Sequence, residues 1–321
     1  MRLEVEHAFA FAYDGYISES FLELRVQPKP TPTQTVLSFT LAVGPRARVY
    51  RYVDWNDNVT HHFTITKFHD RIEVTATSLV ETRPAPVALA GLGSPAGGEM
   101  AYPLLDYLAF DGPVRLTPAL RAAHGALALP RGASLDEQVL AMGQALRDRF
   151  EYQKDVTRYD STTEDFLKLG KGVCQDFAHL MLGWLRLNGI PCRYVSGYLH
   201  VDRKKREPSQ SHAWVEFHAP SAGWVAFDPT HGRPVDERYV VVGHGRHYDD
   251  VPPNKGIYRG TARETLTAEV YTRLVAGTAI PRLSEDVRAI DLRTFAAAPV
   301  RRPAPAVPSA AEEQAQQQQQ Q

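Results

Sequence analysis

The sequence contains very little cysteine, with only Cys174 and Cys192 among its 321 residues. A scaffold held together by disulfides is therefore not expected, and a reducing compartment is favoured. Long apolar runs are missing too, because no stretch approaches the roughly eighteen apolar residues of a membrane span. The N-terminus carries charge where a signal peptide needs an apolar run. We therefore expect a cytoplasmic protein with no membrane partner.

Neither sign of charge is in excess. The 36 Lys and Arg residues balance 37 Asp and Glu residues, for a net charge of -1, so nothing indicates nucleic acid or an acidic membrane surface as a partner. An acidic loop that would bind calcium is also missing. The remaining composition, 43% hydrophobic and 23% charged, is typical of a globular protein with a sizeable core. The length allows one large domain or two ordinary ones.

The first eighty or so residues predict an all-β module. Short segments rich in β-branched and aromatic residues are separated by turns containing Pro, Gly, Asp and Asn. The expected strands are 3–11, 21–26, 36–43, 47–53, 59–66 and 71–78. Their spacing is typical of an antiparallel sandwich or a barrel-like module. His61 and His62 face opposite sides of a strand, so we interpret them as a surface pair rather than metal ligands.

Helical patterning begins after a stretch rich in proline and glycine. The expected helices are 102–110, 117–128, 135–150, 164–169 and 174–188. Ser134 and Glu137 form a capping box, Thr117 and either Thr162 or Thr163 are further caps, and Gly170 and Gly189 end helices. Expected strands follow at 192–199, 211–217, 224–228, 239–242 and 263–275.

This order predicts an α+β chain in four parts. An N-terminal β domain covers 1–82, a linker or loop 83–101, and a catalytic core 102–280. The core is expected to end with the strands at 239–242 and 263–275. Residues 281–321 are poor in apolar periodicity and end in Pro, Ala and Gln, so we expect a largely disordered tail.

Cys174 follows a glycine-rich lead-in and begins an apolar helix, where unpaired N–H groups and the helix dipole favour a thiolate. A thiolate nucleophile needs a base, and the base needs a carboxylate to orient it. His212 and Asp228 lie on neighbouring expected strands joined by a short loop, within reach of one hydrogen bond. A lone cysteine is usually inert, and we interpret Cys192 in that way. The three together predict a Cys174–His212–Asp228 triad.

The phrases around these residues carry a family resemblance. Residues 172–179 (GVCQDFAH), 189–191 (GIP), 211–216 (SHAWVE) and 223–230 (GWVAFDPT) resemble the transglutaminase-like superfamily, and more narrowly its bacterial members with an N-terminal β domain. The resemblance covers about residues 100–275, and the region 1–80 fits the accessory domain. It implies a papain-like α+β core, with the cysteine on a central helix and the histidine and aspartate on the packed sheet.

The chain departs from that family at two points. Cys192 stands where the bacterial pattern more often has alanine, which we interpret as a tolerated core change. The tryptophan that animal transglutaminases place upstream of the cysteine to stabilise the oxyanion has no match here. The backbone N–H of Cys174 is the expected first oxyanion donor, and Tyr152, Tyr159 and Gln144 are candidates for the second.

Two more polar residues follow the nucleophile on its helix. Asp176 either caps the helix or contacts a substrate amine, and we favour the structural role. His179 lies about 140° around the helix from Cys174, which makes it a poor second base. Cys174, His179 and His212 lack a suitably spaced fourth ligand, so we expect no metal and no cofactor.

The sequence thus predicts thiol-dependent acyl transfer, or hydrolysis, at peptide or isopeptide amide bonds of a protein or peptide substrate. The acyl acceptor stays open between water and an amine. The resemblance to the bacterial branch, without a calcium signature, slightly favours hydrolysis. The alternative is a catalytically silent transglutaminase-like scaffold that binds a protein partner.

Overall fold

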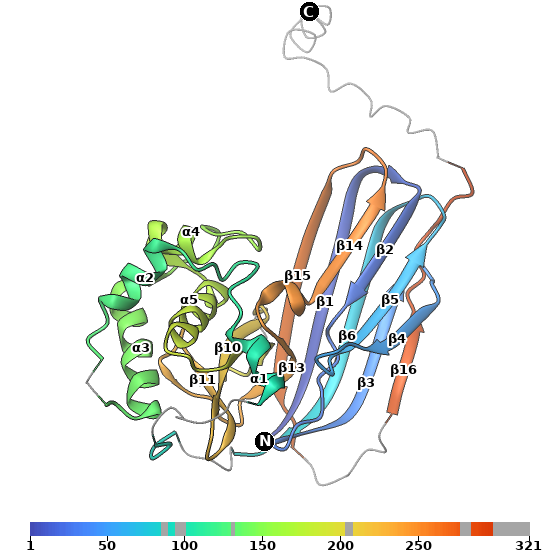
Figure 1. The fold of residues 1–321 in the computed structure, drawn as a ribbon. Helices are drawn as coiled ribbons and strands as arrows, with labels where there is room; N and C mark the ends of the chain where they lie inside the picture. Colours follow the sequence, from blue (N-terminus) through green and yellow to red (C-terminus); the bar gives the residue numbers. More distant parts are fainter. Residues whose placement is uncertain (85–88, 94–100, 130–131, 203–207, 277–283, 298–321) are drawn as a thin grey trace, which may run out of the picture.

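The computed structural model describes residues 1–84, 89–93, 101–129, 132–202, 208–276 and 284–297. A strand-rich region lies beside a mixed region of helices and strands (Figure 1), so the mixed α+β class is confirmed. Parts of the expected linker, at 85–88 and 94–100, and the tail beyond 297 lie outside the described residues. No helix in the described ranges has the length and apolar character to cross a membrane.

The strand-rich region, here called the β region, begins with six strands where six were expected. They are β1 (Arg2–Ile17), β2 (Glu19–Leu24), β3 (Gln34–Gly44), β4 (Val49–Val53), β5 (Val59–Ile65) and β6 (His69–Thr82). Buried and partly buried residues alternate along most of β1, as expected for a strand with one face on a core.

Three further strands come from the C-terminal part of the chain: β14 (Asn254–Arg259), β15 (Glu264–Leu274) and β16 (Ser284–Ala289). One sheet has the order β15-β1-β6-β3-β16 and the other β14-β2-β5-β4. Apolar side chains from both sheets, such as Phe9, Leu24, Phe39 and Phe63, share one buried cluster. Among the described strands the two sheets stay open, so they form no closed barrel.

The C-terminal strands correct two expectations. The strand at 263–275 exists, but it pairs with β1 from Leu3 to Tyr13 instead of closing the core sheet. β16 lies in the segment expected to be disordered and pairs with β3 in parallel. Periodicity can indicate a strand, but it does not say which strand is its neighbour. The residues of β16 are all exposed, so they carry no apolar alternation to detect.

His61 also differs from expectation. Its ring is buried and stacks on Phe39 with the centroids 5.2 Å apart. His62, on the opposite side of the strand, stacks on Tyr50 at 5.3 Å. The two side chains do face opposite ways, but only His62 lies near the surface because the inward face of β5 belongs to the core of the β region.

In the mixed region, here called the core, α2 (Pro118–Gly125), α3 (Leu135–Arg149) and α4 (Thr163–Leu169) surround α5 (Cys174–Leu187). Their expected caps are confirmed. Ser134 and Glu137 form a capping box, and Gly170 ends α4 in the left-handed conformation. The helix expected at 102–110 is shorter: α1 (Tyr102–Leu105) is followed by a 3₁₀ turn at Asp106–Leu108. Neither buries a residue.

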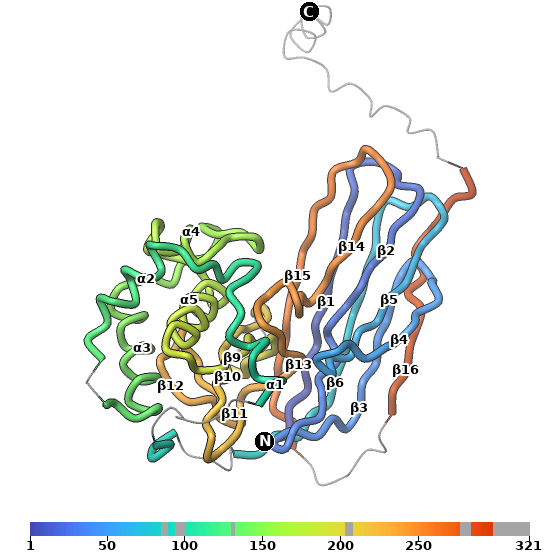
Figure 2. Tube along the Cα trace, viewed as in Figure 1, coloured from blue at the N-terminus to red at the C-terminus, as the bar shows by residue number. Residues whose placement is uncertain are grey.

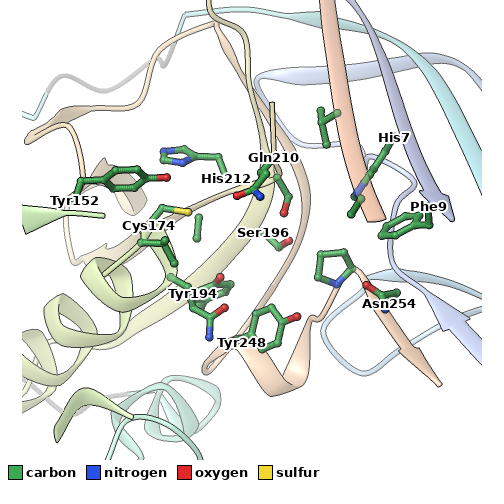
Figure 3. Close-up of a pocket in the computed structure, with 17 residues that line it drawn as sticks. His7, Phe9, Tyr152, Cys174, Tyr194, Ser196, Gln210, His212, Tyr248 and Asn254 are labelled. Atoms are coloured by element: carbon green, nitrogen blue, oxygen red, sulfur yellow. The ribbon is translucent and has the colours of Figure 1, made fainter. Parts of the chain in front are cut away.

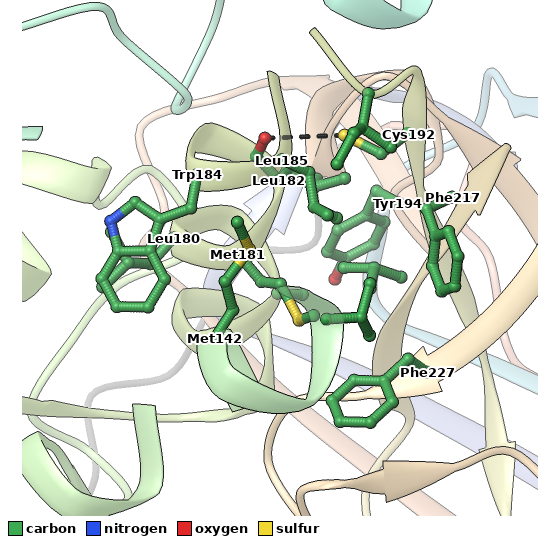
Figure 4. Packing of buried hydrophobic residues seen from close by; sticks show 14 of the residues in the cluster. Met142, Leu180, Met181, Leu182, Trp184, Leu185, Cys192, Tyr194, Phe217 and Phe227 are labelled. Atoms are coloured by element: carbon green, nitrogen blue, oxygen red, sulfur yellow. Dashed lines mark hydrogen bonds between the residues drawn. The ribbon is translucent and has the colours of Figure 1, made fainter. Parts of the chain in front are cut away.

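The core sheet has the order β12-β11-β10-β9-β13. Its strands are β9 (Cys192–Leu199), β10 (His212–Ala219), β11 (Gly223–Asp228), β12 (Arg233–Pro234) and β13 (Tyr239–Gly245). The helix α5 lies between the other helices and this sheet (Figure 2). Its side chains are buried from Asp176 to Arg186, and Figure 4 shows Met181 and Leu182 packed towards Tyr194 and Cys192. A fully buried helix of this kind fixes the position of its first residue, Cys174.

Candidate active site

Cys174 is the first residue of α5, and Asp176 holds the turn that leads into it. The Asp176 carboxylate accepts hydrogen bonds from the Val173 backbone N–H and the Thr157 hydroxyl, both at 2.7 Å. Burial raises the pKa of Asp176 although these two bonds oppose the shift. A side chain at Gly172 would collide with this carboxylate. The geometry therefore supports the structural role for Asp176.

His212 begins β10 and Asp228 ends β11, the neighbouring strand. The His212 Nε2 atom lies 2.7 Å from the Asp228 Oδ2 atom, and the carboxylate is fully buried. The same oxygen accepts from the Tyr239 hydroxyl and lies 2.7 Å from His231 Nδ1. The other oxygen accepts from the backbone N–H groups of Thr230 and His231.

These contacts set the charge of Asp228. Burial alone would raise the pKa of Asp228, but the bonds from His212, His231 and Tyr239 hold it well below its usual range. A buried carboxylate surrounded by donors stays ionised and stable. It therefore gives His212 a fixed negative partner.

His212 carries the complementary charge. Burial alone would lower the pKa of His212, but the hydrogen bond with Asp228 and the neighbouring Cys174 side chain raise it to about 10. By contrast, burial lowers the pKa of the nearby His179 to about 3. His179 Nε2 accepts the backbone N–H of Tyr248 at 3.2 Å. Of these two histidines, the surroundings favour the imidazolium only at His212.

A pocket of about 210 Å³ opens in front of Cys174, here called the catalytic pocket. Cys174, His212 and Tyr152 converge on it from the core (Figure 3). His7 and Phe9 of β1 line its opposite side, so the β region completes the wall. The His7 Nδ1 atom lies 3.0 Å from the Tyr198 hydroxyl, and burial lowers the pKa of His7 to about 3. This far wall is therefore uncharged.

Of the three oxyanion candidates, only Tyr152 lines the catalytic pocket. It belongs to β7 (Glu151–Tyr152), which pairs with β8 (Lys171–Gly172) and places Tyr152 opposite Gly172. Burial and the adjacent Cys174 raise the pKa of Tyr152 to about 12. Tyr152 is therefore a protonated hydroxyl donor beside the nucleophile.

The other two candidates lie elsewhere. Tyr159 lines a neighbouring cavity, and its carbonyl accepts from the Gln175 side chain at 2.8 Å. Gln144 is on α3, where its amide donates to Asp148 at 2.7 Å. Cys192 is buried, its thiol lies 3.5 Å from the Leu182 carbonyl, and burial raises its pKa to about 11. This agrees with a structural thiol.

His231, Tyr239 and His7 are site residues that the sequence did not predict. His231 follows Asp228 by three residues. A turn after Asp228, which its side chain type favours, would bring His231 back to the carboxylate, so this contact could have been predicted from the sequence. Tyr239 reaches Asp228 from β13, which is separated from β11 by two strands, β9 and β10. His7 comes from the other region altogether. Neither position has a local pattern that indicates the site.

His212, Asp228 and His231 offer ligand atoms that all lie within 4.8 Å of one another. The two imidazoles each lie at hydrogen-bond distance from Asp228 Oδ2. These hydrogen bonds account for the proximity of the three groups. A metal ion held at Nε2 of His212 would take the place of the His212–Asp228 hydrogen bond.

The fold and the site together define an α+β protein in which a cysteine at a helix N-terminus meets a histidine and an aspartate of an antiparallel sheet. The model of the Transglutaminase-like superfamily matches residues 127–229, and that of the Bacterial transglutaminase-like N-terminal region matches residues 3–81. The chain belongs to the transglutaminase-like superfamily and carries the bacterial N-terminal region, as its motifs predicted.

Relatives extend over most of the chain. An uncharacterized protein of Mycobacterium leprae is 35% identical over 286 residues, which cover 85% of this chain and 99% of that protein. A crystal structure of a candidate cysteine protease from Cytophaga hutchinsonii has the same fold, with a TM-score of 0.70 and 20% identity over 88% of this chain and 93% of that one. A protein-glutamine gamma-glutamyltransferase of Pseudomonas aeruginosa is 28% identical over 142 residues, 38% of this chain and 21% of that protein.

Proposed function

We propose that the chain is a thiol-dependent acyltransferase or amidase that acts on amide bonds of proteins or peptides. The observation that carries the proposal is the buried His212–Asp228 bond of 2.7 Å beside the thiol of Cys174. Burying a charged carboxylate is costly, because the charge must be compensated by donors such as the three side chains around Asp228. A catalytically silent scaffold would have no use for such an arrangement.

In the first half of the reaction, the Cys174 sulfur attacks the amide carbonyl carbon. The carbonyl oxygen becomes an oxyanion, and we assign the stabilisation of its charge to two hydrogen-bond donors of the core. One is the backbone N–H of Cys174, since the first N–H groups of a helix have no intrahelical partner. The other is the Tyr152 hydroxyl, which stays protonated at neutral pH.

The C–N bond then breaks as the His212 imidazolium gives its proton to the leaving nitrogen. Ammonia or an amine departs, and the acyl group remains on the sulfur as a thioester. In the second half, water or a primary amine attacks this thioester while neutral His212 takes a proton from it. The thiolate leaves and the imidazolium is restored. Asp228 keeps its charge and orients the ring throughout.

The acceptor decides between hydrolysis and crosslinking. The gamma-glutamyltransferase of Pseudomonas aeruginosa, similar over part of the core, is named for transfer from protein glutamine. Among the described residues that line the catalytic pocket none is acidic, although Asp249 and Glu264 line the neighbouring cavity. Because the pocket at the thiol lacks a group that would hold an amine acceptor, we favour hydrolysis.

The test has two steps. Iodoacetamide should alkylate Cys174 rapidly at neutral pH, and His212→Ala should slow this alkylation strongly. Equal, slow alkylation of Cys174 in both proteins would reject catalysis and favour the scaffold. A glutamine peptide with a labelled primary amine then separates the two reactions. Ammonia release without label incorporation would establish the hydrolase, and incorporation the transferase.

A further inference from the structure

A second and larger cavity, of about 530 Å³, lies against the catalytic pocket between the β region and the core. Tyr248 and Asn254 line both cavities. Figure 3 places these two side chains below Cys174, on the side where the core meets the β region. The two cavities therefore lie next to each other with Tyr248 and Asn254 as a shared wall, and we call them together the cleft.

One wall of this cleft is a ladder of paired side chains. The strands β1 and β15 pair in register, and every second residue faces the cleft. The pairs that line the catalytic pocket are His7 with Val270 and Phe9 with Ala268; those that line the larger cavity are Phe11 with Leu266 and Tyr13 with Glu264. Six residues of strand at about 3.4 Å each give this wall a length of about 20 Å. That length matches a segment of about six residues of extended polypeptide.

The facing side of the larger cavity is built from β14 and the core. Residues 255–258 of β14 line the cavity, together with Tyr159 and Asp249 of the core. Among the described strands, β14 has a neighbour on one side only, so the backbone of its other edge faces outwards. Ile257 on this edge is 75% exposed, and Leu266 across the cavity is 41% exposed. Proteins normally keep large apolar side chains away from free strand edges unless something binds there.

We propose that this cleft binds an extended polypeptide segment that flanks the reacting amide of the acyl donor, with apolar side chains of the segment against Leu266 and Ile257. This inference rests on the proposed function and names its substrate class: an unfolded or extended chain. An edge strand recognises an extended chain through its backbone, and pockets select alternate side chains. The lining of the larger cavity carries the acidic Asp249 and Glu264 as well as the basic Lys255, and we assign recognition to shape and apolar contact.

The test measures binding without chemistry. In the Cys174→Ala protein, the affinity for fluorescein-labelled β-casein, which is unfolded in solution, is read from fluorescence anisotropy. We expect the Ile257→Ser/Leu266→Ser double variant to bind at least about tenfold more weakly, because two exposed apolar side chains lose their contacts. The matched control is Leu140→Ser on α3, where Leu140 is 46% exposed and lines neither cavity. Circular dichroism checks that each variant is folded.

The proposal is overturned if the double variant binds as tightly as its parent, if Leu140→Ser weakens binding equally, or if the Cys174→Ala protein does not bind casein. None of these results depends on the state of the thiol. The rate of iodoacetamide alkylation of the unsubstituted protein reports separately on the proposed function. A reactive Cys174 without casein binding would reject polypeptide binding in the cleft and leave the proposed catalysis intact. Casein binding without a reactive Cys174 would reject the proposed catalysis alone.

Discussion

The two walls of the cleft carry different kinds of side chain. On the core side, Cys174, His212 and Asp228 bring a thiol, an imidazolium and a buried carboxylate together. On the side of the β region, the wall consists mainly of a neutral histidine and apolar or aromatic side chains from β1 and β15, with Glu264 at its far end. The core wall has the groups that make and break bonds. The β wall has the shape and the apolar surface that hold a chain in place.

This difference makes a separable prediction for each wall. Changes in the core wall should lower the rate of acylation with little effect on the affinity for a polypeptide. Changes in the β wall, such as those at Leu266 and Ile257, should weaken affinity and leave the reactivity of the thiol intact. The comparison would fail if a variant of the core wall mainly weakened the affinity, or if a variant of the β wall mainly lowered the acylation rate. The predictions below follow the core wall from the largest expected effect to the smallest.

The largest effect is expected from His212→Ala. The variant loses both the proton donor for the leaving group and the positive charge beside the thiol. We expect the rate of acylation by p-nitrophenyl acetate to fall by about 10³-fold or more. The burst of p-nitrophenol measures it. Cys192→Ala is the control and should retain the rate, because that thiol is buried against the Leu182 carbonyl. A burst that survives in His212→Ala would place the reaction at another residue.

Asp228→Asn comes next and is best compared with Asp176→Asn, since both carboxylates are buried. The amide at 228 cannot compensate the His212 charge, so we expect the rate of amide cleavage to fall by about 10²- to 10³-fold. The amide at 176 weakens a helix cap, which should lower the free energy of unfolding by about 1 kcal/mol and change the rate much less. Rates and urea unfolding of the two variants decide this. Equal losses of rate would show that Asp228 acts only through folding.

Much of this wall could be predicted from the sequence, because the signals were local. Cys174 follows a glycine-rich turn, and His212 and Asp228 lie in short phrases on strands that are neighbours in sequence. The β wall could not be predicted in this way. β15 is separated from β1 by about 250 residues of chain, and alternation along a strand does not specify a distant partner. For that reason the cleft, His7 and the docking of β14 and β15 on the β region required the structure.

Tyr152→Phe should lower the rate of amide cleavage by about 10²-fold, because one donor to the oxyanion is removed while the ring remains. Binding of the casein segment to the same variant should be unchanged, since the hydroxyl acts only on the developing charge. Gln144→Ala is the control, as this residue bonds Asp148 on α3, away from the catalytic pocket. A full rate in Tyr152→Phe would assign the second donor elsewhere.

The pH profile should reveal the raised pKa of His212. The His212 proton is needed for the leaving group, so kcat/KM for an amide should fall about tenfold per pH unit above pH 10, where its raised pKa of about 10 lies. The same shift stabilises the fold: this contribution is fully present below the ordinary value of 6.5 and is lost as pH rises through about 10. In Asp228→Asn the alkaline limb should move to lower pH. If the alkaline limb stays in place in Asp228→Asn, Asp228 is not what raises the pKa of His212.

His231→Ala should give the smallest effect, although His231 lies as close to the Asp228 carboxylate as His212 does, at 2.7 Å. Its side chain is 42% exposed, whereas the Tyr239 hydroxyl reaches the same oxygen from a buried position. Water can replace an exposed donor but not a buried one, so we expect a loss of rate of only about two- to threefold in His231→Ala. Tyr239→Phe should lower the rate and the free energy of unfolding more, the latter by about 1.5–3 kcal/mol, since it removes a buried donor to a charged group. Steady-state rates and urea unfolding of the two variants, side by side, measure this order. The reverse order would mean that His231 is part of the catalytic apparatus and not an outer support of Asp228.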